Sequence, residues 1–275
     1  MELGTGRAET IIGLIDGPVA VSHPDLQSEL IRVIPGRLVG TCDAAGSFAC
    51  LHGTLVAGIL SAKRGSAAPA ICPDCTLLVR PIFSEMSAVS AEMPSATAAE
   101  LSEAIVDCVN QGAQVINVSS ALARPSARDG ARLVDALDYC AKRGVVVVAA
   151  AGNQGTVGSS SITRHPSVIP VVACDLRGHP IGYSNLGSSI GRRGLSAPGA
   201  GIISLGVDDR PHTFGGTSAA APFITGAIAL LCSLFPNASP MDVKFALMAG
   251  GRVRRSAIVP ALLDAWAAYR ILQTV

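Results

Sequence analysis

The feature that most constrains the fold is a set of short, continuous apolar runs separated by segments with helical character. The runs cover residues 10–15, 76–82, 114–118, 145–150 and 167–174. Strands that are apolar along their whole length are typical of a parallel sheet with both faces covered. Helical segments lie between them, for example at 98–111 and 129–143. The alternation predicts an α/β fold, a three-layer, doubly wound, mostly parallel sheet with helices on both faces.

Composition supports one large core. The chain has 275 residues, of which 49% are hydrophobic and 15% charged. We find no repeat or linker and expect a single domain over residues 1–275. The net charge is +1 with scattered Lys and Arg, so we expect no nucleic-acid partner. The longest apolar runs, 145–151 and 224–235, are shorter than the roughly 20 residues that span a bilayer, so we expect no membrane partner.

The first residues, Met1–Gly6, lack the pattern of a signal peptide, which favours a cytoplasmic location. The alternative is a secreted protein whose upstream signal and prosegment are missing from this sequence. Only nine residues precede the first apolar run, so the chain is expected to fold unaided inside the cell if nothing has been removed.

Four polar residues stand at the ends of predicted core elements. Asp16 follows the first apolar run, and the carboxyl edge of a parallel sheet is where active-site crevices form. His52 begins an apolar helical segment, whose dipole disfavours imidazolium and keeps a base neutral. Ser218 lies between small residues at the start of another helix, where free N–H groups stabilise negative charge. Asn153 follows the 145–150 run.

Taken singly, each of these residues is more often a turn, cap or packing residue. Together they supply what acyl transfer needs: a hydroxyl nucleophile, a base, and a carboxylate that orients the base. The reaction also needs donors for the developing oxyanion. We expect Asp16, His52 and Ser218 to be catalytic, and Asn153 with the Ser218 backbone N–H to form the oxyanion hole.

Four motifs carry a resemblance to the subtilisin-like (subtilase) serine proteases over nearly the whole chain. They are Leu14–Gly17, His52–Gly58, Ala150–Asn153 and Gly216–Pro222, in the family's order. The resemblance implies a subtilisin-like fold and a serine endopeptidase that hydrolyses peptide bonds through an acyl-enzyme.

The resemblance also implies a substrate cleft, although it matches less completely. Ser119, Ser120 and Ala121 stand where the family has a Ser-Leu-Gly segment that pairs with the substrate backbone as an added strand. Because this chain lacks the Leu and Gly, it is not expected to share the family's broad preference for apolar substrate side chains. Gly152 and Ser160 complete the expected substrate-binding set. Ser160 belongs to a triple serine that is either the floor of the main specificity pocket or a flexible surface loop.

The segment His23–Leu26 resembles the one that supplies a calcium-binding aspartate in secreted members. Its partner loop, 63–69, is short and has no Asn or Asp. Calcium takes about six to eight oxygen ligands, so we expect no calcium site and no cofactor.

Four cysteines in loop-like sequence could replace calcium as a stabilising device. They are Cys42, Cys50, Cys72 and Cys75. Two disulfides are the favoured interpretation, with four free thiols as an alternative and a four-cysteine zinc site as the least favoured one, so no metal is expected.

The segments Asp16–Val19 and Cys75–Phe83, with the short 63–69 loop, resemble proteases that mature ribosomally made peptides, such as the cyanobactin leader-cleaving enzymes. This resemblance implies a precursor peptide as substrate and leader removal in natural product biosynthesis. Two alternatives stay open: a general degradative subtilisin-type protease, and a catalytically silent peptide-binding scaffold. The intact catalytic residues argue against the scaffold.

Overall fold

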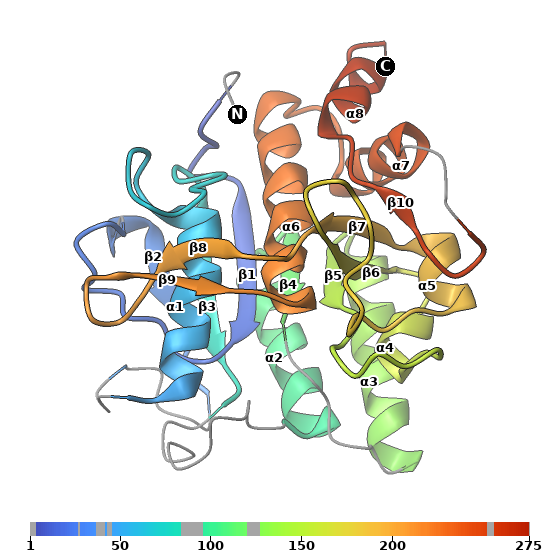
Figure 1. The fold of residues 1–275 in the computed structure, drawn as a ribbon, viewed down its shortest axis with the longest axis horizontal. Coiled ribbons are helices and arrows are strands. Elements are labelled where there is room, and N and C mark those ends of the chain that lie inside the picture. Colours follow the sequence, from blue (N-terminus) through green and yellow to red (C-terminus); the bar gives the residue numbers. More distant parts are fainter. Residues whose placement is uncertain are drawn as a thin grey trace.

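A computed structural model describes residues 4–26, 28–36, 42, 46–83, 96–119, 127–251 and 256–274. Its centre is an eight-stranded sheet. The strands are β1 Ile11–Asp16, β2 Ile31–Val33, β3 Thr76–Pro81, β4 Val115–Val118, β5 Val146–Ala150, β6 Val168–Cys174, β7 Leu195–Pro198 and β10 Ala261–Leu262. Their order is β10-β7-β6-β5-β4-β1-β3-β2, and the described pairings within this sheet are parallel (Figure 1).

Helices cover both faces of this sheet (Figure 1). On one face, α2 (Ala98–Asn110) and α3 (Ala127–Lys142) pack in one cluster with Ile15 and Val147 of the strands. On the other, α1 (Phe48–Ser61) and α6 (Thr217–Leu234) pack with Leu14 and Val148. Neighbouring strand residues such as Leu14 and Ile15 belong to the clusters on opposite faces of the sheet, because successive side chains of a strand point to opposite faces. The predicted three-layer α/β fold is confirmed.

The remaining elements lie around this frame. They are the 3₁₀ turn η1 Ser28–Leu30, α4 Ser161–Arg164, α5 Ser188–Arg193, α7 Pro240–Gly250, α8 Ala265–Leu272 and the antiparallel hairpin of β8 Ile202–Leu205 with β9 Pro211–Phe214. Sequence patterns did not predict α5, β7, β8 or β9, which lie in Gly-rich or polar stretches. The segment 261–272 consists of β10 followed by α8, which begins after the cap residue Asp264.

The central helix α6 is longer than the apolar run suggested. It has 18 residues and is long and apolar enough to cross a membrane by length and composition, yet 83% of it is buried inside the structure. Its apolar side chains are packed against the sheet and against α1. The helix therefore lies at the centre of the core, and its first turn carries Ser218.

Candidate active site

Asp16 and His52 meet at the carboxyl end of β1. Asp16 is fully buried, and its Oδ1 accepts hydrogen bonds from His52 Nδ1 at 2.7 Å and from the Gly17 N–H at 2.6 Å. Because a carboxylate only accepts, the His52 proton lies on Nδ1, and the lone pair of Nε2 is left free to act as a base. Asp16 Oδ2 is buried without a hydrogen-bond partner in the described part of the chain.

The position of His52 within its helix differs from the prediction. Helix α1 begins at Phe48 after the N-cap Ser47, whose Oγ accepts from the Cys50 N–H, so His52 lies in the second turn. The expectation that His52 stands at the start of the helix is therefore wrong. Its ring is held instead by Asp16 and by the edge-on ring of Phe214 from β9, 6.0 Å away between centroids.

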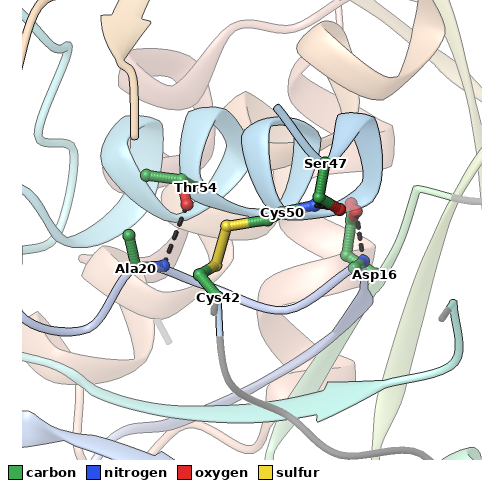
Figure 2. Close-up of a disulfide and its surroundings, with 7 residues drawn as sticks. Asp16, Ala20, Cys42, Ser47, Cys50 and Thr54 are labelled. Atoms are coloured by element: carbon green, nitrogen blue, oxygen red, sulfur yellow. Dashed lines mark hydrogen bonds between the residues drawn. A yellow bond between two sulfur atoms is a disulfide. The ribbon is translucent and has the colours of Figure 1, made fainter. Parts of the chain in front are cut away.

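A disulfide fastens the first turn of α1. Cys42 and Cys50 are bonded, with Cα atoms 5.5 Å apart. Figure 2 shows this bridge beside the chain segment that leads away from Asp16, where Thr54 Oγ1 accepts from the Ala20 N–H at 2.9 Å. The bridge and the hydrogen bond act on the helix that carries His52, so both support the geometry of the base. This half of the disulfide prediction is confirmed.

The second predicted disulfide is wrong, because Cys72 and Cys75 are free thiols. Both are fully buried. The hydrogen bond between them and burial raise the pKa of Cys72 well above its usual range, whereas the same hydrogen bond lowers the pKa of Cys75. A disulfide forms from a thiolate that an oxidant can reach, and these sulfurs are shielded from solvent. With Cys42 and Cys50 bonded to each other, the four cysteines do not supply the four thiolates that such a zinc site needs.

Ser218 lies in the first turn of α6, directly after Gly216 and Thr217. It is 8% exposed, and none of the hydrogen bonds among the described residues involves its Oγ. Four backbone N–H groups at a helix N-terminus lack intrahelical partners, and the helix dipole adds positive potential there. The hydroxyl is therefore free to react at a place that stabilises negative charge.

Asn153 is fixed against this helix terminus through Thr217. Its Oδ1 accepts from the Thr217 N–H at 2.9 Å and from Thr217 Oγ1 at 3.1 Å, and Thr217 Oγ1 in turn accepts from the Gly152 N–H at 3.1 Å. A Cβ on Gly216, which has φ of 105°, would stand 2.8 Å from Asn153 Nδ2. The amide group therefore lies beside the Ser218 turn, and its Nδ2 has no partner in the described ranges.

The predicted substrate segment is described only at its first residue. Ser119 is buried, and its Oγ accepts from Asn117 Nδ2 at 2.7 Å, while Asn117 Oδ1 accepts from Thr225 Oγ1 at 2.9 Å. This buried chain joins α6 to the end of β4. Ser120 and Ala121 lie outside the described residues.

Ser160 is the N-cap of α4. Its Oγ accepts from the Thr163 N–H at 3.2 Å, and Thr163 Oγ1 accepts from the Ser160 N–H at 2.8 Å, which makes a capping box. The structure thus gives this serine an ordered local role. Whether it also lines a specificity pocket stays a prediction.

The segment compared with a calcium site has different contacts here. Lys63 Nζ donates to the Pro24 carbonyl at 2.7 Å, and the Lys63 N–H donates to the Asp25 carbonyl at 2.7 Å. The His23 ring accepts from the Asp25 N–H at 3.0 Å. A carbonyl of this segment therefore already faces an ammonium group, and these residues do not fit a site that takes about six to eight oxygen ligands.

Sequence reasoning missed several residues that shape the site. One is Thr217, which is hydrogen-bonded to Asn153. The others are Phe214, whose ring packs against His52, and Asn185, which binds the 151–156 segment. A signal existed for Asn117 and Thr225, which are polar residues inside apolar elements. No local signal marks Asn185, since its partners lie about thirty positions earlier.

Comparisons with known proteins agree with this geometry. A family model described as the Subtilase family matches residues 7–253. Subtilisin DY from Bacillus licheniformis is 30% identical over 246 residues, which cover 88% of this chain and 83% of that protein. A thermophilic serine proteinase from Bacillus sp. (strain AK1) is 31% identical over 230 residues, covering 83% of this chain and 53% of that longer protein.

Solved structures extend the match to nearly the whole chain. The protease domain of PatA is similar with a TM-score of 0.89 and 29% identity, covering 100% of this chain and 98% of that one. The prenylagaramide maturation protease PagA is similar with a TM-score of 0.85 and 28% identity, covering 98% and 96%. The chain belongs to the subtilase family and is a serine endopeptidase.

Proposed function

We propose that Ser218 is the nucleophile of this endopeptidase and His52 its general base. Ser218 Oγ attacks the scissile carbonyl carbon while His52 Nε2 takes its proton. The protonated ring then returns the proton to the leaving amine, and an acyl-enzyme remains. Water, activated by His52, releases the acyl group in a second step. Asp16, 2.7 Å from His52 Nδ1, holds the ring and stabilises its cationic form.

The oxyanion formed in each step needs donors that are in place before the reaction. We assign this role to Asn153 Nδ2 and to the backbone N–H of Ser218. The supporting observation is that Asn153 Oδ1 is occupied by Thr217, which leaves the NH₂ group as the free end of the amide.

The substrate we propose is a ribosomally made precursor peptide from which a leader is removed. The observation that carries this step is the likeness to two enzymes described as maturation proteases, PatA for patellamide and PagA for prenylagaramide. The likeness to PagA runs over 98% of this chain and 96% of that one, so it includes the surroundings of the site as well as the core.

The test compares substrates and a nucleophile variant. We expect site-specific cutting of precursor peptides encoded beside the gene, and slow digestion of casein. Ser218→Ala should lower kcat by roughly 10⁶ and abolish labelling by a fluorophosphonate probe. Ser66→Ala, in the loop after α1, is the matched serine control and should label normally.

The outcomes separate the alternatives. Rapid general digestion of casein would favour a degradative protease over a maturation enzyme. A wild-type protein that binds peptides but neither labels nor cleaves would be a scaffold. Near-normal activity of Ser218→Ala would refute the mechanism itself.

A further inference from the structure

The segment that carries Asn153 is paired with a second segment about thirty residues later. Residues 152–158 and 183–187 exchange backbone hydrogen bonds: Asn185 N–H to Gly152 O at 2.9 Å, Gly155 N–H to Tyr183 O at 2.8 Å, Leu186 N–H to Thr156 O at 3.0 Å and Gly158 N–H to Leu186 O at 2.7 Å. Ser184 Oγ accepts from the Ala173 N–H of β6 at 3.0 Å and so anchors the second segment to the sheet.

The side chain of Asn185 adds five hydrogen bonds to this pairing. Its Nδ2 donates to the Ala151 carbonyl at 3.1 Å and to Gln154 Oε1 at 2.7 Å. Its Oδ1 accepts from the Gln154 N–H at 3.1 Å and from Thr156 N–H and Oγ1 at 3.1 and 3.0 Å. One amide therefore binds residues on both sides of Asn153, and none of these five hydrogen bonds is to Asn153 itself.

Asn185 can lie this close to the 151–156 segment because residue 152 is a glycine. Its φ is 105°, and a Cβ at this position would overlap Asn185 Nδ2 and stand 2.7 Å from Gln154 Oε1. On the other side, the Gly152 N–H is bonded to Thr217 Oγ1. The turn at 152–153 is thus held between the α6 terminus and Asn185.

We propose that Asn185 is a positioning residue that holds the oxyanion donor Asn153 in its reactive place. Asn153 is exposed, and its own side chain is tied only to Thr217 in the described part of the protein. Without the Asn185 amide, the Ala151, Gln154 and Thr156 groups would turn to water, and the loop could move the Asn153 NH₂ group off the oxyanion. This inference rests on the proposed role of Asn153.

A double-mutant cycle tests the inference. Asn153→Ala is expected to lower kcat by about 10²–10³. Asn185→Ala is expected to lower kcat by about 10- to 100-fold, since a displaced donor loses much of its effect, with KM changed by less than about threefold. Asn153→Ala/Asn185→Ala should then fall within about threefold of Asn153→Ala, because residues that act through one group are not additive. Asn237→Ala, an exposed asparagine between α6 and α7, is the matched control.

The outcomes are distinguishable. If the two losses multiply in the double variant, Asn185 acts elsewhere and the inference is overturned. If Asn153→Ala keeps its kcat, the proposed oxyanion role fails on its own, whatever Asn185 does. Should Asn185→Ala not fold, Thr156→Val removes one of the five bonds at an exposed position. It should lower kcat about two- to fivefold in the wild type and not in Asn153→Ala, and equal losses in both backgrounds would overturn the inference.

Discussion

Thr225→Val tests the buried polar chain that joins α6 to β4. Thr225 and Asn117 are both fully buried, and Thr225 Oγ1 donates to Asn117 Oδ1 at 2.9 Å. Valine has nearly the shape of threonine, so the substitution leaves no cavity and removes only the hydroxyl. Asn117 Oδ1 then has no donor, while Asn117 Nδ2 stays bound to Ser119 Oγ.

The magnitude follows from the cost of an unpaired buried acceptor, about 1–3 kcal/mol in the free energy of unfolding. With about 2.1 cal/mol/K per residue, a chain of 275 residues unfolds with an entropy of about 0.6 kcal/mol/K near its Tm. The expected fall in Tm is therefore about 2–5 °C.

Thermal unfolding is to be followed by circular dichroism in a Ser218→Ala background, so that self-digestion does not distort the curves. Thr213→Val is the matched control, because Thr213 is exposed on β9 and its change should stay within about 0.5 kcal/mol. The smallest expected fall in Tm for Thr225→Val is about 2 °C. If the Tm values of Thr225→Val and Thr213→Val differ by less than about 1 °C, the argument that this hydrogen bond stabilises the core is refuted.

Four further expectations concern other parts of the molecule. Asp16→Asn should keep the fold, shown by an unchanged spectrum, but lower kcat about 10⁴-fold because His52 loses its orienting carboxylate; a loss below tenfold would contradict this. Replacing Cys42 and Cys50 by Ser should lower the free energy of unfolding by up to about 2.6 kcal/mol, from a loop with a sequence separation of 8, and an unchanged denaturation midpoint would contradict that. Hydrogen bonds from Ser239, first from its hydroxyl and then from its N–H, lower the pKa of Asp242, so the contribution of this carboxylate to stability is present above about pH 4 and is lost as pH falls. The difference in free energy of unfolding between wild type and Asp242→Asn should therefore shrink on acidification, and a difference that does not depend on pH would contradict this. We propose that the enzyme needs no bound metal, so EDTA should leave activity and Tm unchanged, and a clear fall in either would show a metal site.

The cellular location stays a proposal. We propose the cytoplasm, although a bond such as Cys42–Cys50 persists mainly in oxidising compartments. The other six cysteines are buried thiols, and burial raises the pKa of Cys140 and of Cys232 to about 12. Alkylation of Cys42 and Cys50 in intact producing cells would favour the cytoplasm, and resistance to alkylation would favour a secreted enzyme.

Core strands were predictable from the sequence because strands buried on both faces must be apolar throughout. The apolar runs 10–15 and 145–150 are strands β1 and β5 within one residue of the predicted bounds. The hairpin β8–β9 was missed because its two strands have only four residues each and are not buried throughout, with Ile203 exposed in β8 and Thr213 exposed in β9. The start of α1 was missed even though Ser47 is a typical N-cap.

Two of the residues expected in the site lie at the end or the beginning of a core element. Asp16 ends β1, and Ser218 lies in the first turn of α6, so topology alone brings them to one edge of the sheet. The supports could not be found in this way. Asn185 acts on residues 151–156 only after the chain has passed through β6, and Cys72 and Cys75 remain thiols because of burial, which spacing does not reveal.

The pairing of 152–158 with 183–187 has a consequence for protein engineering. A loop exchange that imports residues 152–158 from another subtilase would replace the loop that the Asn185 side chain binds. It would also replace the loop residues that are hydrogen-bonded to the backbone of Tyr183 and Leu186. The two stretches are one structural unit interrupted by β6, and recombination crossovers placed between them should yield mostly inactive chimeras. Libraries that move both stretches together, with the β6 contact at Ser184 retained, should keep turnover while changing which peptide is cut.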